Sequence, residues 1–299
     1  MKTTFAVLIV SAIFLLSFTK PKQPVTTLDG MKKALKLGYA YVPTGSVNFE
    51  GKTVSIQGFF MLKTEISNLH YLEFLSALKL AGKMDEYTAA LPDTLAWRTP
   101  LAFGEKYTDY YLRHPAYKDY PVVNITKIQA EKYCEWLTQV WRGKTGNESI
   151  VFRLPTRIEY LKAAWGNSSG RTYAWDSPYI SDEKGMPRCN FLNIGSGSIT
   201  RDTITGEFKV VKNYYSDAFA GSLNEFADLT APVESYKANE FGIFNLNGNV
   251  SEMVSENGIA VGGDWNSPGY DVRNESTKAF TKANPMVGFR PVMTFVETK

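Results

Sequence analysis

The chain has 299 residues, of which 44% are hydrophobic, 21% charged and 14% aromatic, and its formal net charge is +3. This composition is that of a globular protein, which argues against a disordered chain or a coiled coil. Lys and Arg are spread along the sequence without a basic block, so we expect no nucleic-acid partner. The length suits one large domain or two modest ones.

The first residues, MKTTFAVLIVSAIFLLSFTK, have the pattern of an export signal. Lys2 precedes an apolar run from Phe5 to Phe18, which fits a signal-peptide core and is short for a membrane span. No cysteine follows the run, so we expect no lipid anchor at that point. We predict a signal peptide over residues 1–19, a polar tether over 20–30 and one domain over 31–299.

The first part of the predicted domain combines short strands and a helix. YAYVPTGSVNFEG and KTVSIQGFFML, from residue 38 onward, predict strands separated by Pro and Gly turns. EISNLHYLEFLSALKLAG predicts an amphipathic helix capped near Ser67 and ended by Gly82. Its expected apolar face is Leu69, Leu72, Leu75 and Leu78. Residues 83–123 are rich in Tyr and Pro and are expected to form loops.

Two more helices are expected before the regular pattern fades. One runs from about Ile128 to Arg142, with Thr126 as its cap. Its apolar face is predicted to be Ala130, Tyr133, Cys134, Leu137 and Val140. RLPTRIEYLKAAWG, residues 153–166, predicts the other. Residues 166–240 are expected to be loop-rich, and such a stretch usually needs metal or aromatic packing to fasten it. IAVGGDW and VGFRPVMTFVE predict closing strands.

The residues that could carry chemistry are few. Cys134 and Cys189 are the only cysteines, and with two histidines in the chain a three-imidazole site is impossible. The cysteines could pair in an exported protein, although a buried thiol on a helix face explains Cys134 more simply. Asp264 is either catalytic or a structural acid beside Trp265. The aromatic residues Trp165, Tyr173 and Trp175 either bind sugar or peptide or pack in the core.

The stretch FGIFNLNGNVSEM, residues 241–253, has two readings. Asn and Gly tolerate positive φ, so it could be a polar turn. It also offers amide, carbonyl and carboxylate oxygens, which are the ligands of a hard cation such as calcium. The residues alone leave both readings open.

Five segments, in order, resemble motifs of the formylglycine-generating enzyme (sulfatase-modifying factor) family and together span roughly residues 40–295. They are FFMLKTEISNLHYLEFL, YPVVNITKIQAEKYCEWL, FRLPTRIEYLKAAWG, the stretch at 241–253, and VGGDW with GFRPV. Arg157 and Tyr160 depart from the third motif. HPAYKDYPVVN and the spacing of SPYISDEKG before CNF look most like a non-catalytic bacterial branch, which includes the gliding-motility and type IX secretion lipoproteins K and J.

The resemblance implies an α+β fold, a loop-rich variant of the C-type-lectin-like fold fastened by structural calcium. In a first calcium site, Asn245 and Glu252 would use side-chain oxygens, and Gly248 and Val250 their carbonyls. A second site would use Asn190, the Phe191 carbonyl, Glu225 and the Ala227 carbonyl, with Asp228 as a rival to Glu225.

The resemblance also permits a chemical test. Catalytic members oxidise a substrate cysteine with copper held by two thiolates, and the corresponding positions here are Ser267 and Val272. Cu(I) prefers soft thiolate ligands, which neither residue supplies. We therefore expect no copper-dependent oxidation.

The function expected from the sequence is that of an exported, calcium-stabilised pseudoenzyme. It would act as a binding or scaffold component of a bacterial envelope, in the periplasm or at the outer membrane, with envelope proteins as partners. Two alternatives are an enzyme on the same fold, using Asp264, Ser267 and neighbouring Arg residues, and a carbohydrate-binding lectin-like module.

Overall fold

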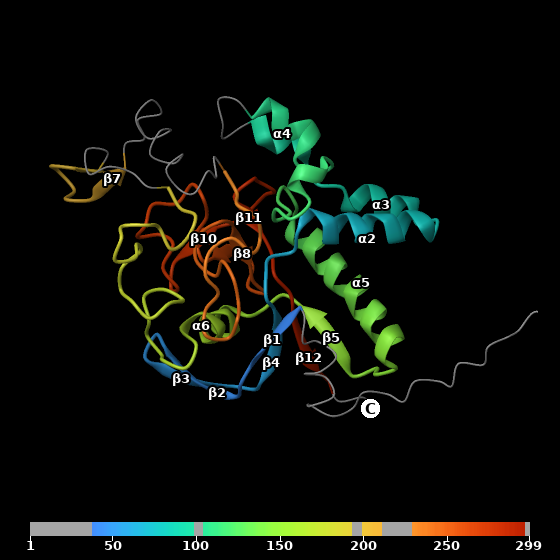
Figure 1. Ribbon diagram of the computed structural model, residues 1–299, viewed down its shortest axis with the longest axis horizontal. Helices are drawn as coiled ribbons and strands as arrows, with labels where there is room; N and C mark the ends of the chain where they lie inside the picture. The colour runs from blue at the N-terminus through green and yellow to red at the C-terminus, as the bar shows by residue number, and fades with distance from the viewer. Residues whose placement is uncertain (1–37, 99–103, 193–198, 211–228, 297–299) are drawn as a thin grey trace, which may run out of the picture.

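A computed structural model of the protein describes residues 38–98, 104–192, 199–210 and 229–296 (Figure 1). A four-stranded antiparallel sheet lies near its centre, with the strand order β1-β4-β12-β5. Its strands are β1 (Tyr39–Val42), β4 (Phe59–Leu62), β12 (Val292–Phe295) and β5 (Ile150–Arg153). The expected strands near residue 38 and at the C-terminal end therefore pair with one another.

Side chains alternate between the two faces of this sheet, as the period of two in a β-strand requires. Phe60, Leu62 and Met293 belong to the apolar cluster that includes the long helices. Their neighbours Phe59, Met61 and Val292 belong to a second cluster, on the other face. Strand β4 is buried throughout because both of its faces are covered.

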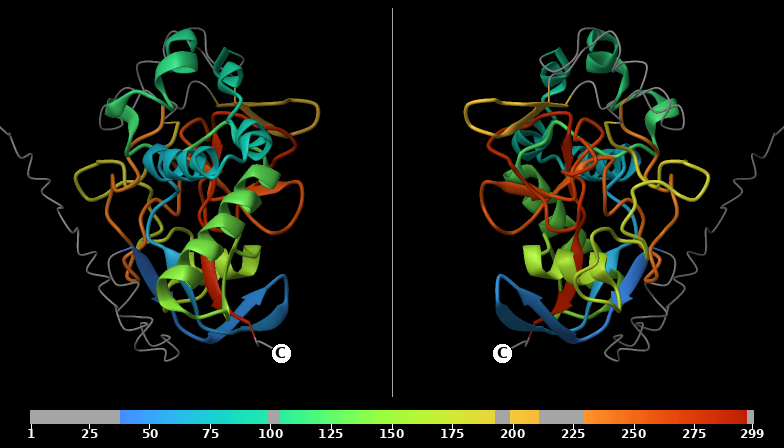
Figure 2. Two further views of the ribbon diagram at one scale, coloured as in Figure 1. Left: turned by 90° about the vertical axis from the view of Figure 1, so that its right-hand side faces the viewer. Right: turned by 90° about the vertical axis from the view of Figure 1, so that its left-hand side faces the viewer.

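One face of this sheet is covered by three helices, α2 (Asn68–Leu80), α3 (Met84–Ala90) and α5 (Lys127–Thr145). Figure 2 shows α5 lying across the sheet. Thr126 caps α5 through its side chain, and the side chain of Gln129 bonds back to the Thr126 backbone N–H at 2.7 Å. This reciprocal pair is the capping box that begins many helices. The expected helix is therefore confirmed, with three more residues at its C-terminal end.

The apolar faces of α2 and α5 differ in part from the expected ones. Leu69 and Val140 are each 42% exposed, whereas Tyr71 and Trp141 are buried. Large rings dominate this core: Tyr71 stacks on Tyr133 with ring centroids 5.9 Å apart. The prediction of a leucine stripe was wrong at Leu69 because the bulkier rings one or two positions along the helix set its rotation.

The expectation of loops over residues 83–123 was also partly wrong. This stretch contains α3, α4 (Glu105–Tyr110) and the 3₁₀ turns η1 (Thr94–Arg98) and η2 (Pro115–Tyr117). Helices of six or seven residues span fewer than two turns and leave little periodicity to detect. Trp97, Tyr107 and Tyr111 pack together and hold these short elements.

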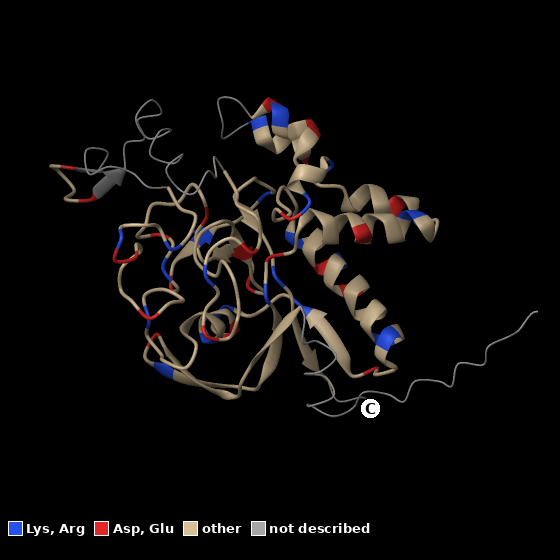
Figure 3. Cartoon of the chain, in the orientation of Figure 1, with Lys and Arg blue, Asp and Glu red and all other residues tan. Residues whose placement is uncertain are grey.

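A second sheet, of order β10-β9-β8-β11, contains the last three residues of the stretch 241–253. Its strands are β8 (Ser251–Met253), β9 (Ile259–Val261), β10 (Thr277–Ala279) and β11 (Val287–Gly288). Two hairpins complete the described strands: β2 (Gly45–Phe49) with β3 (Lys52–Ile56), and β6 (Ile199–Arg201) with β7 (Phe208–Val210). Figure 3 shows basic and acidic positions interspersed along the ribbon.

Helix α6 (Arg157–Trp165) covers the other face of the first sheet. Thr156 caps it, and Glu159 completes a capping box by accepting from the Thr156 N–H at 2.8 Å. Arg153 Nη1 and Nη2 each donate to the Glu159 carboxylate at 2.7 Å. Burial alone would raise the pKa of Glu159, but the bonds from Arg153 and Thr156 outweigh it and lower that pKa.

Replacing Glu159 by Gln is expected to lower the free energy of unfolding by about 1–2 kcal/mol at pH 7. Gln still caps a helix, as Gln129 does in α5, so the substitution removes mainly the charge. A carboxyl with a lowered pKa stabilises the fold above its unfolded-state pKa, and this contribution disappears as the pH falls through the folded-state pKa. Urea titrations should therefore show a difference that shrinks below about pH 4. A difference that persists at pH 3 would contradict this account.

The sequence left open whether Cys134 and Cys189 pair. Cys134 and Cys189 are both buried free thiols in separate apolar clusters, so the structure contains no bond between them. Within the described ranges, no helix is long and apolar enough to cross a membrane. The predicted signal peptide and tether lie outside the described residues.

Candidate functional site

The loop before β8 adopts the conformation that its Asn and Gly residues permit. Asn245, Gly248 and Asn249 all have positive φ, at 51°, 73° and 62°. Gly248 lies directly against the backbone of Asn190: a Cβ added to Gly248 would be 2.2 Å from the Asn190 carbonyl oxygen. The turn reading of this stretch is therefore correct as far as its backbone is concerned.

The same loop encloses a buried ionic network. Glu65, Glu252 and Arg290 are each at most 1% exposed. Arg290 Nε donates to Glu252 Oε2 at 3.0 Å, and Arg290 Nη2 donates to Oε1 at 2.7 Å. The guanidinium also donates to the carbonyls of Lys63 and Phe244, so Arg290 holds three segments together. Burial alone would lower the pKa of Arg290, but Glu252 outweighs it and raises that pKa.

Glu65 is the second acid of this network. Burial raises its pKa to about 8. Asn249 Nδ2 donates to Glu65 Oε1 at 2.9 Å, and Asn245 Nδ2 donates to Oε2 at 3.3 Å. The sequence analysis missed this residue, although an acid at the apolar entry to a helix, in KTEISNL, was a signal that could have found it.

The predicted first calcium ligands can be compared with this geometry. Asn245 Oδ1 is buried and has no hydrogen-bond partner. Buried acceptors normally have a partner, and a bound cation would supply one. Glu252 already accepts three bonds from Arg290. A carboxylate has about four acceptor positions, which leaves room for one further partner. Asn245 Oδ1 and Glu252 therefore offer hard oxygen acceptors of the kind that calcium prefers.

The second predicted site lies against the first. Asn190 is buried, its carbonyl accepts from the Asn249 N–H at 2.7 Å, and its Nδ2 donates to the Leu229 carbonyl at 2.6 Å. Phe191 is buried beside it. The other predicted ligands, Glu225 and Ala227, and the rival Asp228, lie outside the described residues. Among the described residues, no cluster of three or more His, Cys, Asp or Glu side chains could hold a metal, but the predicted sites depend on amides and carbonyls.

The positions that correspond to the family's copper ligands lie in a packed region. Val272 is fully buried in an apolar cluster with Tyr173, Cys189 and Phe191. Cys189 is distant from Val272 in the sequence, yet the fold brings the two side chains into one cluster. Burial raises the pKa of the Cys189 thiol, which disfavours the thiolate that metals require.

Asp264 is a structural acid in this arrangement. It is fully buried, and its carboxylate accepts from Lys278 Nζ at 2.6 Å and from Ser251 Oγ at 3.0 Å. Ser267 Oγ accepts from the Asp264 N–H at 3.2 Å. Both residues are thus occupied in holding the loop between β9 and β10.

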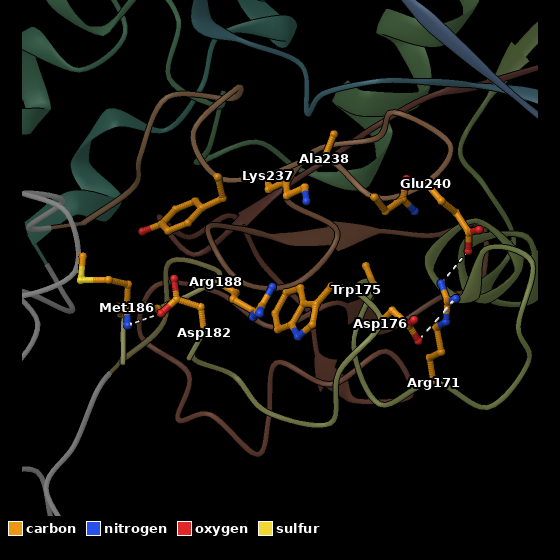
Figure 4. Close-up of a pocket in the computed structure, with 13 residues that line it drawn as sticks. Arg171, Trp175, Asp176, Asp182, Met186, Arg188, Lys237, Ala238 and Glu240 are labelled. Carbon is orange, nitrogen blue, oxygen red and sulfur yellow. Dashed lines mark hydrogen bonds and ion pairs between the residues drawn. The ribbon is translucent and has the colours of Figure 1, made fainter. Parts of the chain in front are cut away.

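A cavity of about 740 Å³ adjoins this region (Figure 4), since Trp175 borders it and also packs against the cluster that contains Val272. Its wall combines the segment from Arg171 to Asp176, the turn from Asp182 to Arg188, and the segment from Tyr236 to Glu240. Trp175 borders it, whereas Trp165 and Tyr173 are buried in the core. The expectation of core packing therefore holds for two of the three aromatic residues, and the third borders a pocket of ligand-binding size.

Comparison with known proteins gives the same family as the motifs. The sequence profile of the sulfatase-modifying factor enzyme 1-like domain matches residues 35–295. The formylglycine-generating enzyme of Streptomyces coelicolor is 33% identical over 152 residues, which are 51% of this chain and 34% of that protein. The corresponding Mus musculus enzyme is 24% identical over 226 residues, which are 69% of this chain and 50% of that protein. The chain thus spans between a third and a half of the length of these curated relatives.

Solved structures support the fold. PvdO from Pseudomonas aeruginosa superimposes with a TM-score of 0.52 at 18% identity, covering 91% of this chain and 99% of that chain. Treponema denticola variable protein 1 gives a TM-score of 0.51 at 13% identity, covering 85% and 93%. The predicted α+β fold is confirmed, whereas the gliding-motility branch stays a prediction. Because the family profile matches most of its length, the chain belongs to the sulfatase-modifying factor enzyme 1-like domain family.

Proposed function

We propose that this protein is a binding or scaffold domain that has kept the fold of its family and lost copper-dependent cysteine oxidation. The observation that carries the proposal is the identity of the two copper positions, Ser267 and Val272. Val272 has no atom that can bind a metal, and it is fully buried among apolar side chains. Cu(I) requires soft ligands, and Cys189, the thiol in this cluster, is a single buried group.

The proposal is tested by assaying the activity for which the curated relatives are named, the conversion of a peptide cysteine to formylglycine. A peptide carrying a cysteine in a formylglycine-generating-enzyme substrate motif is incubated with the protein, Cu(I) and oxygen, and the aldehyde product is measured by mass spectrometry. We expect no conversion above that of copper without protein. Catalytic turnover of the peptide would contradict the proposal.

Calcium is proposed as the ion that fastens the loop before β8. The support is the buried Asn245 Oδ1, which lacks a partner, together with the remaining acceptor position of Glu252. An ion that binds only the folded chain would stabilise the fold, because its binding free energy adds to the free energy of unfolding and favours the ordered loops.

Calcium at 1,000 times its Kd should raise the melting temperature by several degrees above the value in chelator, since such binding stabilises by about 4 kcal/mol. Asn245→Ala or Glu252→Ala should abolish the difference. Asn274→Ala is the matched control: Asn274 is also a buried amide, bonded to Asn247 and the Arg171 carbonyl, and its loss should lower both melting temperatures while the difference remains. Identical melting of the natural protein in calcium and in chelator would refute the calcium proposal.

An envelope role accompanies the proposal because of the predicted signal peptide and the resemblance to the gliding-motility and type IX secretion branch. Fractionation of the source cells tests it: the protein should be found in the periplasm or with the outer membrane, without residues 1–19. Recovery of the uncleaved chain from the cytoplasm would contradict export.

An enzyme with different chemistry on this fold is the main alternative. It would use Asp264 and Ser267, yet the cavity of about 740 Å³ is bordered by other residues. The Asp264 carboxylate is held by Lys278 and Ser251. These observations favour the binding role.

A further inference from the structure

The cavity of about 740 Å³ contains an unusual distribution of charge (Figure 4). Three basic and three acidic residues border it: Arg171, Arg188, Lys237, Asp176, Asp182 and Glu240. The formal charges of these six residues sum to zero, but the acids and bases are not all paired with one another. We refer to this cavity below as the charged pocket.

The acids of the charged pocket have partners within the protein, as does one of its bases. Glu240 accepts from Arg171 Nη1 at 2.5 Å and from the Asn167 side chain at 2.6 Å. Asp182 accepts from the backbone N–H groups of Lys184 and Met186, which closes its own turn. Asp176 lies 3.7 Å from Arg171 and is 94% exposed.

The other two bases are different. Arg188 and Lys237 form no ion pair within 4 Å of any residue in the described parts of the chain, and Arg188 Nε is buried without a hydrogen-bond partner. The charge of Arg188 does contribute to Asp182, where the backbone bond from Met186 is the first cause of a lowered carboxyl pKa and Arg188 a smaller one. Arg171 Nε is also buried without a partner, but Arg171 pairs with Glu240 through Nη1. Arg188 is partly exposed and has no such pair, so its guanidinium is open to a ligand acceptor.

These two bases and an aromatic ring converge. A second cavity, of only about 20 Å³, is bordered by Trp175, Arg188 and Lys237, which also border the charged pocket. The two bases and the indole therefore share part of the wall in both cavities. Tyr173 stacks on Trp175 with centroids 4.8 Å apart and planes inclined by 10°, so the indole is fixed from one side.

We propose that the charged pocket binds an acidic carbohydrate, with a sugar carboxylate held by Arg188 and Lys237 and a pyranose ring packed against Trp175. This inference deepens the proposed binding role and rests on it. Guanidinium groups pair with carboxylates through two parallel bonds, which suits Arg188 to a uronate. Sugar hydroxyls donate to carboxylates, so Asp176 and Asp182 provide suitable acceptors for the rest of the ring.

An acidic peptide suits the charged pocket less well. It would bring carboxylates for Arg188 and Lys237 but no ring hydroxyls to donate to Asp176 and Asp182, whereas a uronate ring carries both groups. A neutral sugar would leave Arg188 Nε without the charge-assisted bond that its burial calls for.

The test uses the full chain and isothermal titration with trigalacturonate. Its methyl ester, which is the same trisaccharide without the charges, serves as the control ligand. We expect trigalacturonate to bind with a Kd of about 1 mM or tighter and the ester at least tenfold more weakly. Arg188→Gln and Lys237→Gln should each weaken trigalacturonate binding about tenfold or more, and Trp175→Ala should weaken both ligands.

Lys184→Gln is the matched control, since Lys184 is exposed on the same turn but does not border the charged pocket. It should leave the Kd unchanged. The basic variants should melt near the natural protein, because they lose no internal ion pair among the described residues.

Several outcomes would overturn the assignment. They are an absence of trigalacturonate binding, equal binding of the ester, or a Kd that the two basic variants do not change. Tighter binding of a pentaglutamate peptide with the same dependence on Arg188 would assign the pocket to peptide instead. None of these outcomes alters the expected lack of peptide oxidation, so failure of the ligand assignment is distinguishable from failure of the proposed loss of catalysis.

Discussion

Replacing Arg290 by Leu is expected to lower the free energy of unfolding by about 3–5 kcal/mol, because it leaves a buried carboxylate without its counter-charge. Arg290 is fully buried and binds Glu252 through two nitrogens. The substitution also removes donors from the carbonyls of Lys63 and Phe244, which hold the end of β4 to the loop before β8. Urea unfolding monitored by tryptophan fluorescence gives the value.

The charge argument has its own control. Glu252→Leu combined with Arg290→Leu removes both charges, and buried ion pairs are often replaced by apolar residues at little cost. The double variant should therefore be more stable than Arg290→Leu alone, and less destabilised than the two single changes added together. These urea titrations are carried out in the presence of a calcium chelator, so that calcium binding contributes nothing to the measured free energy of unfolding. Simple additivity would show that the two residues are not coupled.

Replacing Gly248 by Ala is expected to cost about 3 kcal/mol or more. Part of the cost is the positive φ of 73°, which a residue with a Cβ adopts at a penalty of about 1–3 kcal/mol. The larger part is contact, because the new Cβ would stand 2.2 Å from the Asn190 carbonyl oxygen and 3.3 Å from Cys189 Cβ. The loop before β8 and the segment around Asn190 would have to separate.

Gly258→Ala separates the two contributions. Gly258 has a φ of 80°, but no heavy atom lies within 4 Å of the position its Cβ would take. It should therefore cost only the backbone penalty, about 1–2 kcal/mol. If urea titrations show equal losses for the two glycines, the close approach to Asn190 does not stabilise the fold.

The local part of the fold could be predicted from the sequence, because its signals are local. Thr126 and Gln129 mark the start of α5, and nineteen residues of helix leave a clear apolar face. Helices α3 and α4 were missed because seven and six residues are too few to show a period. Helix propensity could not show that Trp141 rather than Val140 faces the core, because the choice depends on the packing of Trp141 against Phe152 of β5.

The site could be predicted only where a motif carried it. The stretch from Asn245 to Glu252 could be singled out because its candidate oxygen ligands stand close together in the sequence, and calcium binding there stays a prediction. Glu65 was missed, since its contact with Asn245 joins residues 180 positions apart. The charged pocket was also missed: Arg188 and Lys237 carry no distinguishing pattern, and only the folded loops bring them beside Trp175.

Copper binding tests the central claim most directly. The protein, with Cys134 and Cys189 reduced, is titrated with Cu(I) against a chromogenic Cu(I) chelator, and Ser267→Cys combined with Val272→Cys is titrated as the matched variant. We predict that the natural protein takes no copper from the chelator, since a pair of thiolates is absent from the two positions. The double variant should bind one equivalent if the fold still places these positions as in the catalytic relatives. One equivalent of tightly bound copper in the natural protein would contradict the account.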